Sequence, residues 1–94
     1  MIQLVLLVEV NPGKMDFVKE QITLLAKHTR AEEGCISYDA YFSTNNENTI
    51  SFIESWTDQA ALDAHIASKH IADYRANTAD CFASRNLNFL ERIA

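Results

Sequence analysis

Hydrophobic residues follow two spacings along this chain, and each spacing predicts one kind of secondary structure. Four segments are rich in β-branched and aromatic residues and are bounded by polar or turn-forming residues, which is typical of strands. A short polar run at residues 43–48 joins the second segment to the third and predicts an antiparallel hairpin. The four predicted strands are Ile2–Val10, Cys35–Phe42, Thr49–Trp56 and Ser84–Ile93.

The segments between these strands carry hydrophobic residues three and four positions apart, as amphipathic helices do. The first predicted helix runs from Lys14 to about Arg30, and Gly34 follows where the chain must leave it. Thr57 or Asp58 can cap the next helix by accepting its free amide protons. We expect a second helical stretch to begin near His70 and to place four residues on one side: Ile71, Tyr74, Thr78 and Phe82.

The order of these elements is β-α-β-β-α-β, which is the ferredoxin-like arrangement of an α+β protein. It predicts a four-stranded antiparallel sheet with both helical regions on one face. The chain has 94 residues, which is too short for two independent cores. We therefore expect a single domain that spans residues 1–94.

The first strand is hydrophobic on both faces, which is unusual for a sheet with one face in water. Since the predicted helices cover only one face, we expect a second copy of the chain to cover the other, which predicts a homodimer. The alternative is that strand propensity alone fills a solvent-exposed face with Val and Leu. On the face away from the helices we place Val5, Leu7, Cys35, Tyr41 and Ile53.

Composition and charge exclude several classes of partner. The eight Lys and Arg residues are scattered and the net charge is −5, so we expect no binding of nucleic acid. No segment approaches the roughly 20 apolar residues of a membrane span. The apolar N-terminus is interrupted by Glu9 and lacks the basic start of a signal peptide, so we expect a cytoplasmic protein without membrane contact. Cys35 and Cys81 fit core positions better than a disulfide.

Glu54 is a candidate catalytic residue because it stands among large apolar side chains on the third strand. The alternating pattern places Ile50, Phe52 and Trp56 on the same face as Glu54. Burial raises the pKa of a carboxyl group, as a general acid or base near neutral pH requires. The alternative is an ordinary ion pair between Glu54 and one of three arginines: Arg30, Arg75 or Arg85.

His65 is a second candidate, since it follows the third strand on a half-apolar helix face beside Leu62 and Ile66. It is either a base or a core residue with satisfied hydrogen bonds. Five residues of helix separate it from His70, which corresponds to a rotation of about 140°. The two rings would then point apart, with no obvious third ligand, so we expect no metal site. His28 falls on the polar side of the first helix.

Three aromatic residues with polar tips can line a pocket for a flat ligand: Tyr38, Trp56 and Tyr74. The chain has no glycine-rich phosphate loop, nucleophile elbow, metal-ligand cluster or nucleotide fingerprint. We therefore expect that it uses no cofactor.

Three runs of residues together resemble the antibiotic biosynthesis monooxygenase family, and in particular its small bacterial quinol-monooxygenase-like branch. They are TRAEEGCISYD at Thr29–Asp39, ESW at Glu54–Trp56 and ALDAHIASKH at Ala61–His70, and they occur in the family's order and spacing. The resemblance implies a dimeric α+β barrel whose protomers each hold a pocket between the sheet and the helices. Related members include cofactor-free oxygenases, quinol oxidases, haem-degrading enzymes and an isomerase of autoinducer-2 phosphate.

The resemblance also assigns residues by motif. Glu54 and Trp56 match the family's E-x-W, and His65 and His70 match its H-x4-H. The segment R-A-E-x-G-C-x-x-Y-D is matched by Arg30, Tyr38 and Asp39. The haem-degrading branch uses an Asn on the first strand and a Trp in the helix, and this chain has neither there.

These observations favour a cofactor-independent monooxygenase or quinol oxidase that acts on a small aromatic substrate and oxygen. His65, or Glu54 acting through it, would be the catalytic base. Two alternatives stay open: an isomerase of a small phosphorylated metabolite such as autoinducer-2 phosphate, with Arg30 and Arg75 as phosphate contacts, and a non-catalytic dimer that binds a small ligand. The expected substrate-binding residues are Trp56, Tyr38, Tyr74, Arg30 and His70.

Overall fold

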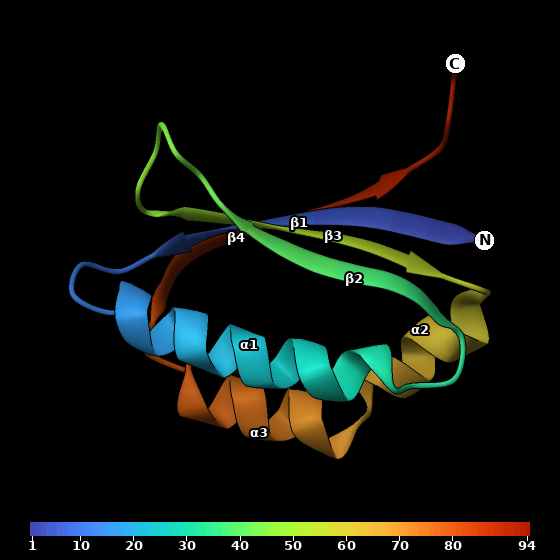
Figure 1. Cartoon of the computed structure of the whole chain (residues 1–94), viewed down its shortest axis with the longest axis horizontal. Helices are drawn as coiled ribbons and strands as arrows, with labels where there is room; N and C mark the ends of the chain where they lie inside the picture. The colour runs from blue at the N-terminus through green and yellow to red at the C-terminus, as the bar shows by residue number, and fades with distance from the viewer.

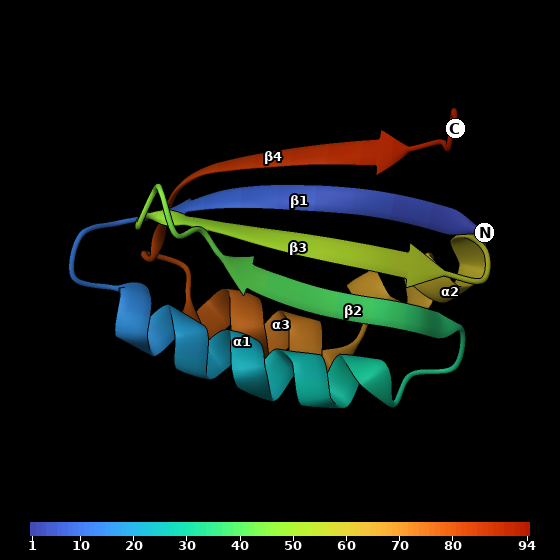
Figure 2. The same cartoon turned by 45° about the horizontal axis from the view of Figure 1, so that its top comes forward.

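The computed structural model describes residues 1–94 and confirms the α+β, ferredoxin-like arrangement. Four strands form one antiparallel sheet in the order β2-β3-β1-β4. All three helices lie against one face of it, and the opposite face carries no helix (Figures 1 and 2). The elements are β1 (Ile2–Val10), α1 (Met15–Arg30), β2 (Cys35–Phe42), β3 (Thr49–Trp56), α2 (Gln59–Ile66), α3 (Lys69–Asn77) and β4 (Phe82–Leu90).

The register of the sheet decides which side chains face the helices. Leu4 of β1 stands opposite both Glu54 of β3 and Phe89 of β4. Since side chains alternate along a strand, the even-numbered residues of β1 and β3 point toward the helices. These positions supply much of the buried core, including Val8 and Phe52. None of the helices is long and apolar enough to cross a membrane.

The second helical region consists of two helices with a capped break between them. Asp58 is the N-cap of α2, and its side chain accepts a hydrogen bond from the backbone of Ala61. Ser68 is the N-cap of α3; its hydroxyl accepts from the backbone amide of Ile71 and donates to the carbonyl of His65. Because Ser68 serves both helices, the break between α2 and α3 is a defined corner of the fold.

The boundary between α3 and β4 differs from the prediction. Phe82 is the first residue of β4 and not part of the helix, which ends at Asn77. Thr78 donates its hydroxyl to the carbonyl of Tyr74, and the amide of Cys81 then donates to the carbonyl of Thr78, so the chain turns there. The helical spacing of apolar residues continues through this turn only by coincidence.

Cys35 does not lie on the outer face of the sheet, as predicted, but packs against the core. The register shifts between Cys35 and Ser37, and this irregularity places Cys35 opposite Trp56 on the inner face. Among the other apolar side chains predicted on the outer face, Val5 is half-buried and three are exposed, with exposed fractions of 38% for Leu7, 46% for Ile53 and 56% for Tyr41. Both cysteines are free.

Candidate active site

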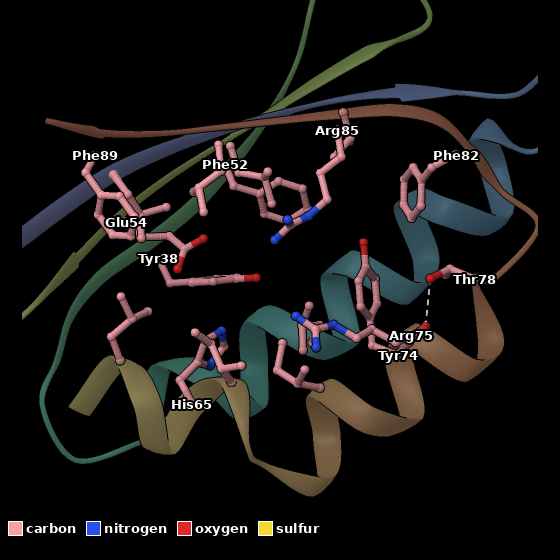
Figure 3. Close-up of a pocket in the computed structure, with 18 of the residues that line it drawn as sticks. Tyr38, Phe52, Glu54, His65, Tyr74, Arg75, Thr78, Phe82, Arg85 and Phe89 are labelled. Atoms are coloured by element: carbon pink, nitrogen blue, oxygen red, sulfur yellow. Dashed lines mark hydrogen bonds between the residues drawn. The ribbon is translucent and has the colours of Figure 1, made fainter. Parts of the chain in front are cut away.

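A cavity of about 270 Å³ lies between the inner face of the sheet and helices α2 and α3 (Figure 3). Fourteen of the 19 residues that line it are hydrophobic. The polar residues among them come from different elements, including Tyr38 of β2, Glu54 of β3 and His65 of α2. A mostly apolar cavity with a few converging polar groups is the usual form of a small-molecule site.

His65 is buried in the wall of this cavity and is bonded to a carboxylate behind it. Its Nδ1 lies 2.6 Å from Oε2 of Glu32. Its ring also packs 4.6 Å from the ring of Trp56 and 5.6 Å from that of Tyr38. Burial lowers the pKa of His65, and the hydrogen bond and charge of Glu32 oppose that effect. A neutral ring that donates from Nδ1 to Glu32 keeps a free lone pair on Nε2, as a general base requires.

Glu32 is the most important residue that the sequence interpretation missed. It lies in the turn between α1 and β2, where its backbone amide donates to the carbonyl of Thr29. The signal was available, because Glu32 is the acidic residue of the R-A-E-x-G-C segment that also contains Arg30 and Cys35.

His70 lies close to His65, so the prediction that their rings point apart was wrong. The rotation of about 140° assumes one continuous helix, whereas the chain turns at Ser68 between α2 and α3. The Nε2 atom of His70 lies 3.1 Å from Oε2 of Glu32, although it is buried and makes no hydrogen bond of good geometry. His28 is exposed, as expected, and stacks on His70 with ring centroids 5.8 Å apart.

Glu32 is also the third ligand that the sequence did not indicate. The donor atoms of Glu32, His65 and His70 all lie within 4.8 Å of one another. Two imidazoles and one carboxylate are a donor set that can hold a divalent transition metal. That the purified protein carries no metal stays a prediction, which elemental analysis tests.

Glu54 is buried in the wall of the cavity and has no cationic partner. Its Oε1 accepts a hydrogen bond from Nε1 of Trp56 at 3.1 Å. No ion pair joins it to any of the three arginines that the alternative interpretation offered, Arg30, Arg75 and Arg85. Burial raises the pKa of Glu54, while the bond from Trp56 and the charge of Arg85 partly oppose the rise. Glu54 is therefore a carboxyl group with perturbed acidity at the cavity wall.

Three of the five predicted substrate contacts do not line the cavity: His70, Trp56 and Arg30. Trp56 is fully buried and supports Glu54 and His65 from behind. Arg30 lies on the other side of β2, where its Nε donates to the carbonyl of Tyr38 at 3.1 Å and a terminal nitrogen lies 3.6 Å from Asp39. Arg30 therefore fixes the strand that carries Tyr38 and does not reach a ligand in the cavity.

Tyr38 and Tyr74 do line the cavity, and two arginines join them there. Burial raises the pKa of both phenols, so both remain protonated donors at neutral pH. Arg75 of α3 and Arg85 of β4 point toward the same space (Figure 3). Arg85 was predictable in principle, because it precedes Leu87 by two residues on a strand and must share its face.

Comparisons with known proteins agree with this geometry. Residues 1–77 match the model of a family described as antibiotic biosynthesis monooxygenase. The chain is 34% identical over 76 residues to putative monooxygenase YcnE of Bacillus subtilis, covering 81% of this chain and 80% of that protein. It is 42% identical over 70 residues to putative monooxygenase Rv0793 of Mycobacterium tuberculosis, covering 74% and 68%.

A solved structure of similar fold points to the same family. The crystal structure of an antibiotic biosynthesis monooxygenase superposes with a TM-score of 0.91 at 25% identity and covers all of both chains. The resemblance seen in the sequence is thereby confirmed over the greater part of the chain. This protein belongs to the antibiotic biosynthesis monooxygenase family.

Proposed function

We propose that this protein oxidises a hydroxylated aromatic substrate with molecular oxygen and without a cofactor, as a monooxygenase or quinol oxidase. The observation that carries the proposal is the Glu32–His65 pair in the wall of an apolar cavity, with Nδ1 of His65 held 2.6 Å from the carboxylate. Nε2 is then the atom that can accept a proton from a phenolic hydroxyl in the cavity.

Removal of that proton is the step for which the site is suited. A phenolate gives up an electron to oxygen more readily than a phenol does, so the substrate supplies the electrons. A hydroquinone that loses two electrons and two protons becomes a quinone, and the oxygen molecule that gains them becomes hydrogen peroxide. In a monooxygenation, a ring CH₂ becomes a carbonyl and the second oxygen atom leaves as water with the two hydrogens.

The remaining residues of the cavity suit the same reaction. The ring of Tyr38 lies between Glu54 and His65 in the close-up view (Figure 3). Apolar side chains such as Phe52 and Leu62 surround these groups and exclude water, which strengthens electrostatic interactions between the base and the hydroxyl. Glu54, with its raised pKa, is the second candidate for the base.

The test is oxidation of menadiol under air, followed by oxygen uptake and by quinone absorbance. Because menadiol also oxidises on its own, each rate is compared with a blank and with the same concentration of heat-denatured protein. We expect a saturable rate above both controls. A rate equal to the blank for menadiol and for other hydroquinones would refute the proposal and favour a protein that binds a small ligand without turnover.

A second candidate function has one observation in its favour. An isomerase of a small phosphorylated metabolite needs cationic contacts for the phosphate, and Arg75 and Arg85 line the cavity without a partner. The same base would then catalyse enolisation. Incubation with autoinducer-2 phosphate, followed by NMR of the sugar carbons, tests it; unchanged spectra would dismiss it.

A further inference from the structure

We propose that the substrate is an aromatic acid, with its hydroxyl at His65 and an anionic group farther along the cavity, between Arg75 and Arg85. The placement of the hydroxyl end of the ligand at His65 rests on the proposed function. The placement of its anionic end rests on the two arginines alone and can be tested without turnover.

The two arginines in the cavity differ from the other two in the chain. The guanidinium groups of Arg75 and Arg85 make no hydrogen bond and no ion pair within the protein. By contrast, Arg30 bonds to the carbonyl of Tyr38, and Arg92 bonds to the carbonyl of Ala94. A guanidinium group is always charged and presents a fork of donors that fits a carboxylate or a phosphate.

The charge of the cavity lining is opposite in sign to the net charge of the chain. The whole chain carries a net charge of −5. The cavity lining nevertheless contains two arginines and only one carboxyl group, Glu54, which burial drives toward its neutral form. Both arginines are solvent-exposed residues that line the same apolar cavity, so an anion that reaches both meets two unpaired guanidinium groups at once.

Neutral donors face the same part of the cavity. Figure 3 shows the hydroxyls of Tyr38 and Tyr74 turned into the space that Arg75 and Arg85 also reach. Neither hydroxyl is hydrogen-bonded within the protein. Four donor side chains on β2, α3 and β4 therefore converge, and none of them has an acceptor within the protein. Of these four residues, only Arg85 lies beyond residue 77, where the match to the family model ends.

The positions of the two ends set the shape of the ligand. In the close-up view His65 lies at the left, Arg75, Arg85 and Tyr74 lie to its right, and Phe82 and Thr78 lie beyond them (Figure 3). An apolar cavity of roughly 150 Å³ holds benzene in another protein, so about 270 Å³ suits a ligand of one or two rings. A hydroxyl and a carboxylate on opposite sides of two fused rings satisfy both ends at once.

Binding of matched naphthalene probes tests the inference. 6-Hydroxy-2-naphthoate carries the two groups at opposite ends, 2-naphthol lacks the carboxylate, and 3-hydroxy-2-naphthoate carries the two groups side by side. By fluorescence titration at low salt we expect the first probe to bind about 10-fold more tightly than the other two, since hydrogen bonds to charged groups contribute at this order. The preference should shrink as salt is added.

Substitutions assign the preference to the arginines. Arg75→Gln and Arg85→Gln should each remove most of the preference for 6-hydroxy-2-naphthoate and leave the Kd of 2-naphthol within about 2-fold. Arg92→Gln removes the same charge outside the cavity and should change neither Kd. Equal binding of 6-hydroxy-2-naphthoate and 2-naphthol, or a preference that survives both cavity substitutions, would overturn the inference.

Two further outcomes separate this inference from the proposed function. If 2-naphthyl phosphate binds through the arginines more tightly than the carboxylate, the anion is a phosphate and the aromatic-acid assignment fails. If 6-hydroxy-2-naphthoate binds as expected but no hydroquinone is oxidised, the anion site stands and the oxidase proposal falls.

Discussion

The two faces of the sheet differ in the burial and pairing of their polar residues. On the side that faces the helices, the buried carboxyl and imidazole groups are each matched to a particular partner, as Glu54 is to Trp56 and His65 is to Glu32. On the outer face serines and asparagines alternate with exposed apolar side chains, and Leu7 and Ile53 are both more than a third exposed.

This difference indicates what each face does. A buried carboxyl group or imidazole costs free energy unless it is paired, so the inner face keeps such groups at a price in stability that a function explains. The outer face has no such groups, and its exposed apolar side chains are typical of a contact surface. We therefore treat the inner face as the site and propose that the outer face binds a second copy of the chain.

Replacement of His65 is expected to have the largest effect. His65→Ala should lower turnover by about 10²-fold or more, because a positioned base contributes roughly 10²–10⁴-fold. The affinity for a non-oxidised probe such as 2-naphthol should change little. Steady-state oxygen uptake and a titration with the probe measure the two effects on one preparation.

Stability provides the control for that substitution. Loss of a buried side chain costs roughly 1–3 kcal/mol in the free energy of unfolding, so a melting curve must accompany the rate. Normal turnover per folded molecule with a lowered melting temperature would show that His65 only packs in the core. The catalytic assignment would then move to Glu54, and Glu54→Gln would be the next variant to measure.

The fold was predictable from the sequence because its signals are local. Alternation in β1 and β3 and the helical spacing in α1 depend on neighbouring residues, and all four strands were predicted at nearly their observed positions. A second helical stretch from about His70 was predicted, but the capped corner at Ser68 was not, because a serine within helical spacing is a weak signal until its caps are known. That single corner brings His70 to Glu32.

The site was less predictable because it depends on contacts between distant residues. Glu32 and His65 are 33 positions apart, and no periodicity links a turn to the inside of a later helix. Two arginines show the same limit. The family motif includes Arg30, which lies outside the cavity, and does not include Arg85, which lines it. Residue type suggested the chemistry, and the packing of α2 and β4 decided which residues take part.

A charge on the outer face tests the other half of the comparison. If Leu7 is buried between two copies, Leu7→Glu leaves an unpaired charge there and should weaken association by several kcal/mol. Sedimentation should then give a dimer for the native chain at micromolar concentration and a monomer for the variant. Thr44→Glu adds the same charge in the exposed hairpin and should leave the dimer intact. A native chain that sediments as a monomer would remove the proposed interface.

The turn that carries Glu32 to the inner face depends on Gly34, which has a φ of +84°. A Cβ atom there would lie 2.5 Å from Cβ of Ala61 and 2.7 Å from the hydroxyl of Thr57. Gly34→Ala should therefore destabilise the fold by about 2–3 kcal/mol, through backbone strain and this clash. Gly13 has a φ of +80° with no atom within 4 Å, so Gly13→Ala should cost only the strain. Equal melting temperatures for both variants would show that the turn can move away from α2.

The smallest expected effect concerns Glu32, and it distinguishes a residue that positions the base from one that only stabilises the turn. Glu32→Gln keeps the shape of the side chain but removes its charge, and an amide that donates to Nδ1 would move the ring proton to Nε2. Turnover at neutral pH should fall about 10-fold, which is part of what the base contributes.

The pH profile gives that variant a readout that a structural role would not change. If His65 is the base, its neutral form is the active one. Because burial lowers its pKa, turnover of the native protein should then fall only as the pH drops below the ordinary range for histidine and should be level above it. Glu32 raises the pKa of His65 against that burial. Without the carboxylate the pKa falls further, and the acid limb of the profile should move to lower pH in Glu32→Gln. A reduced rate with an unmoved acid limb would mean that Glu32 supports the turn but does not hold the base.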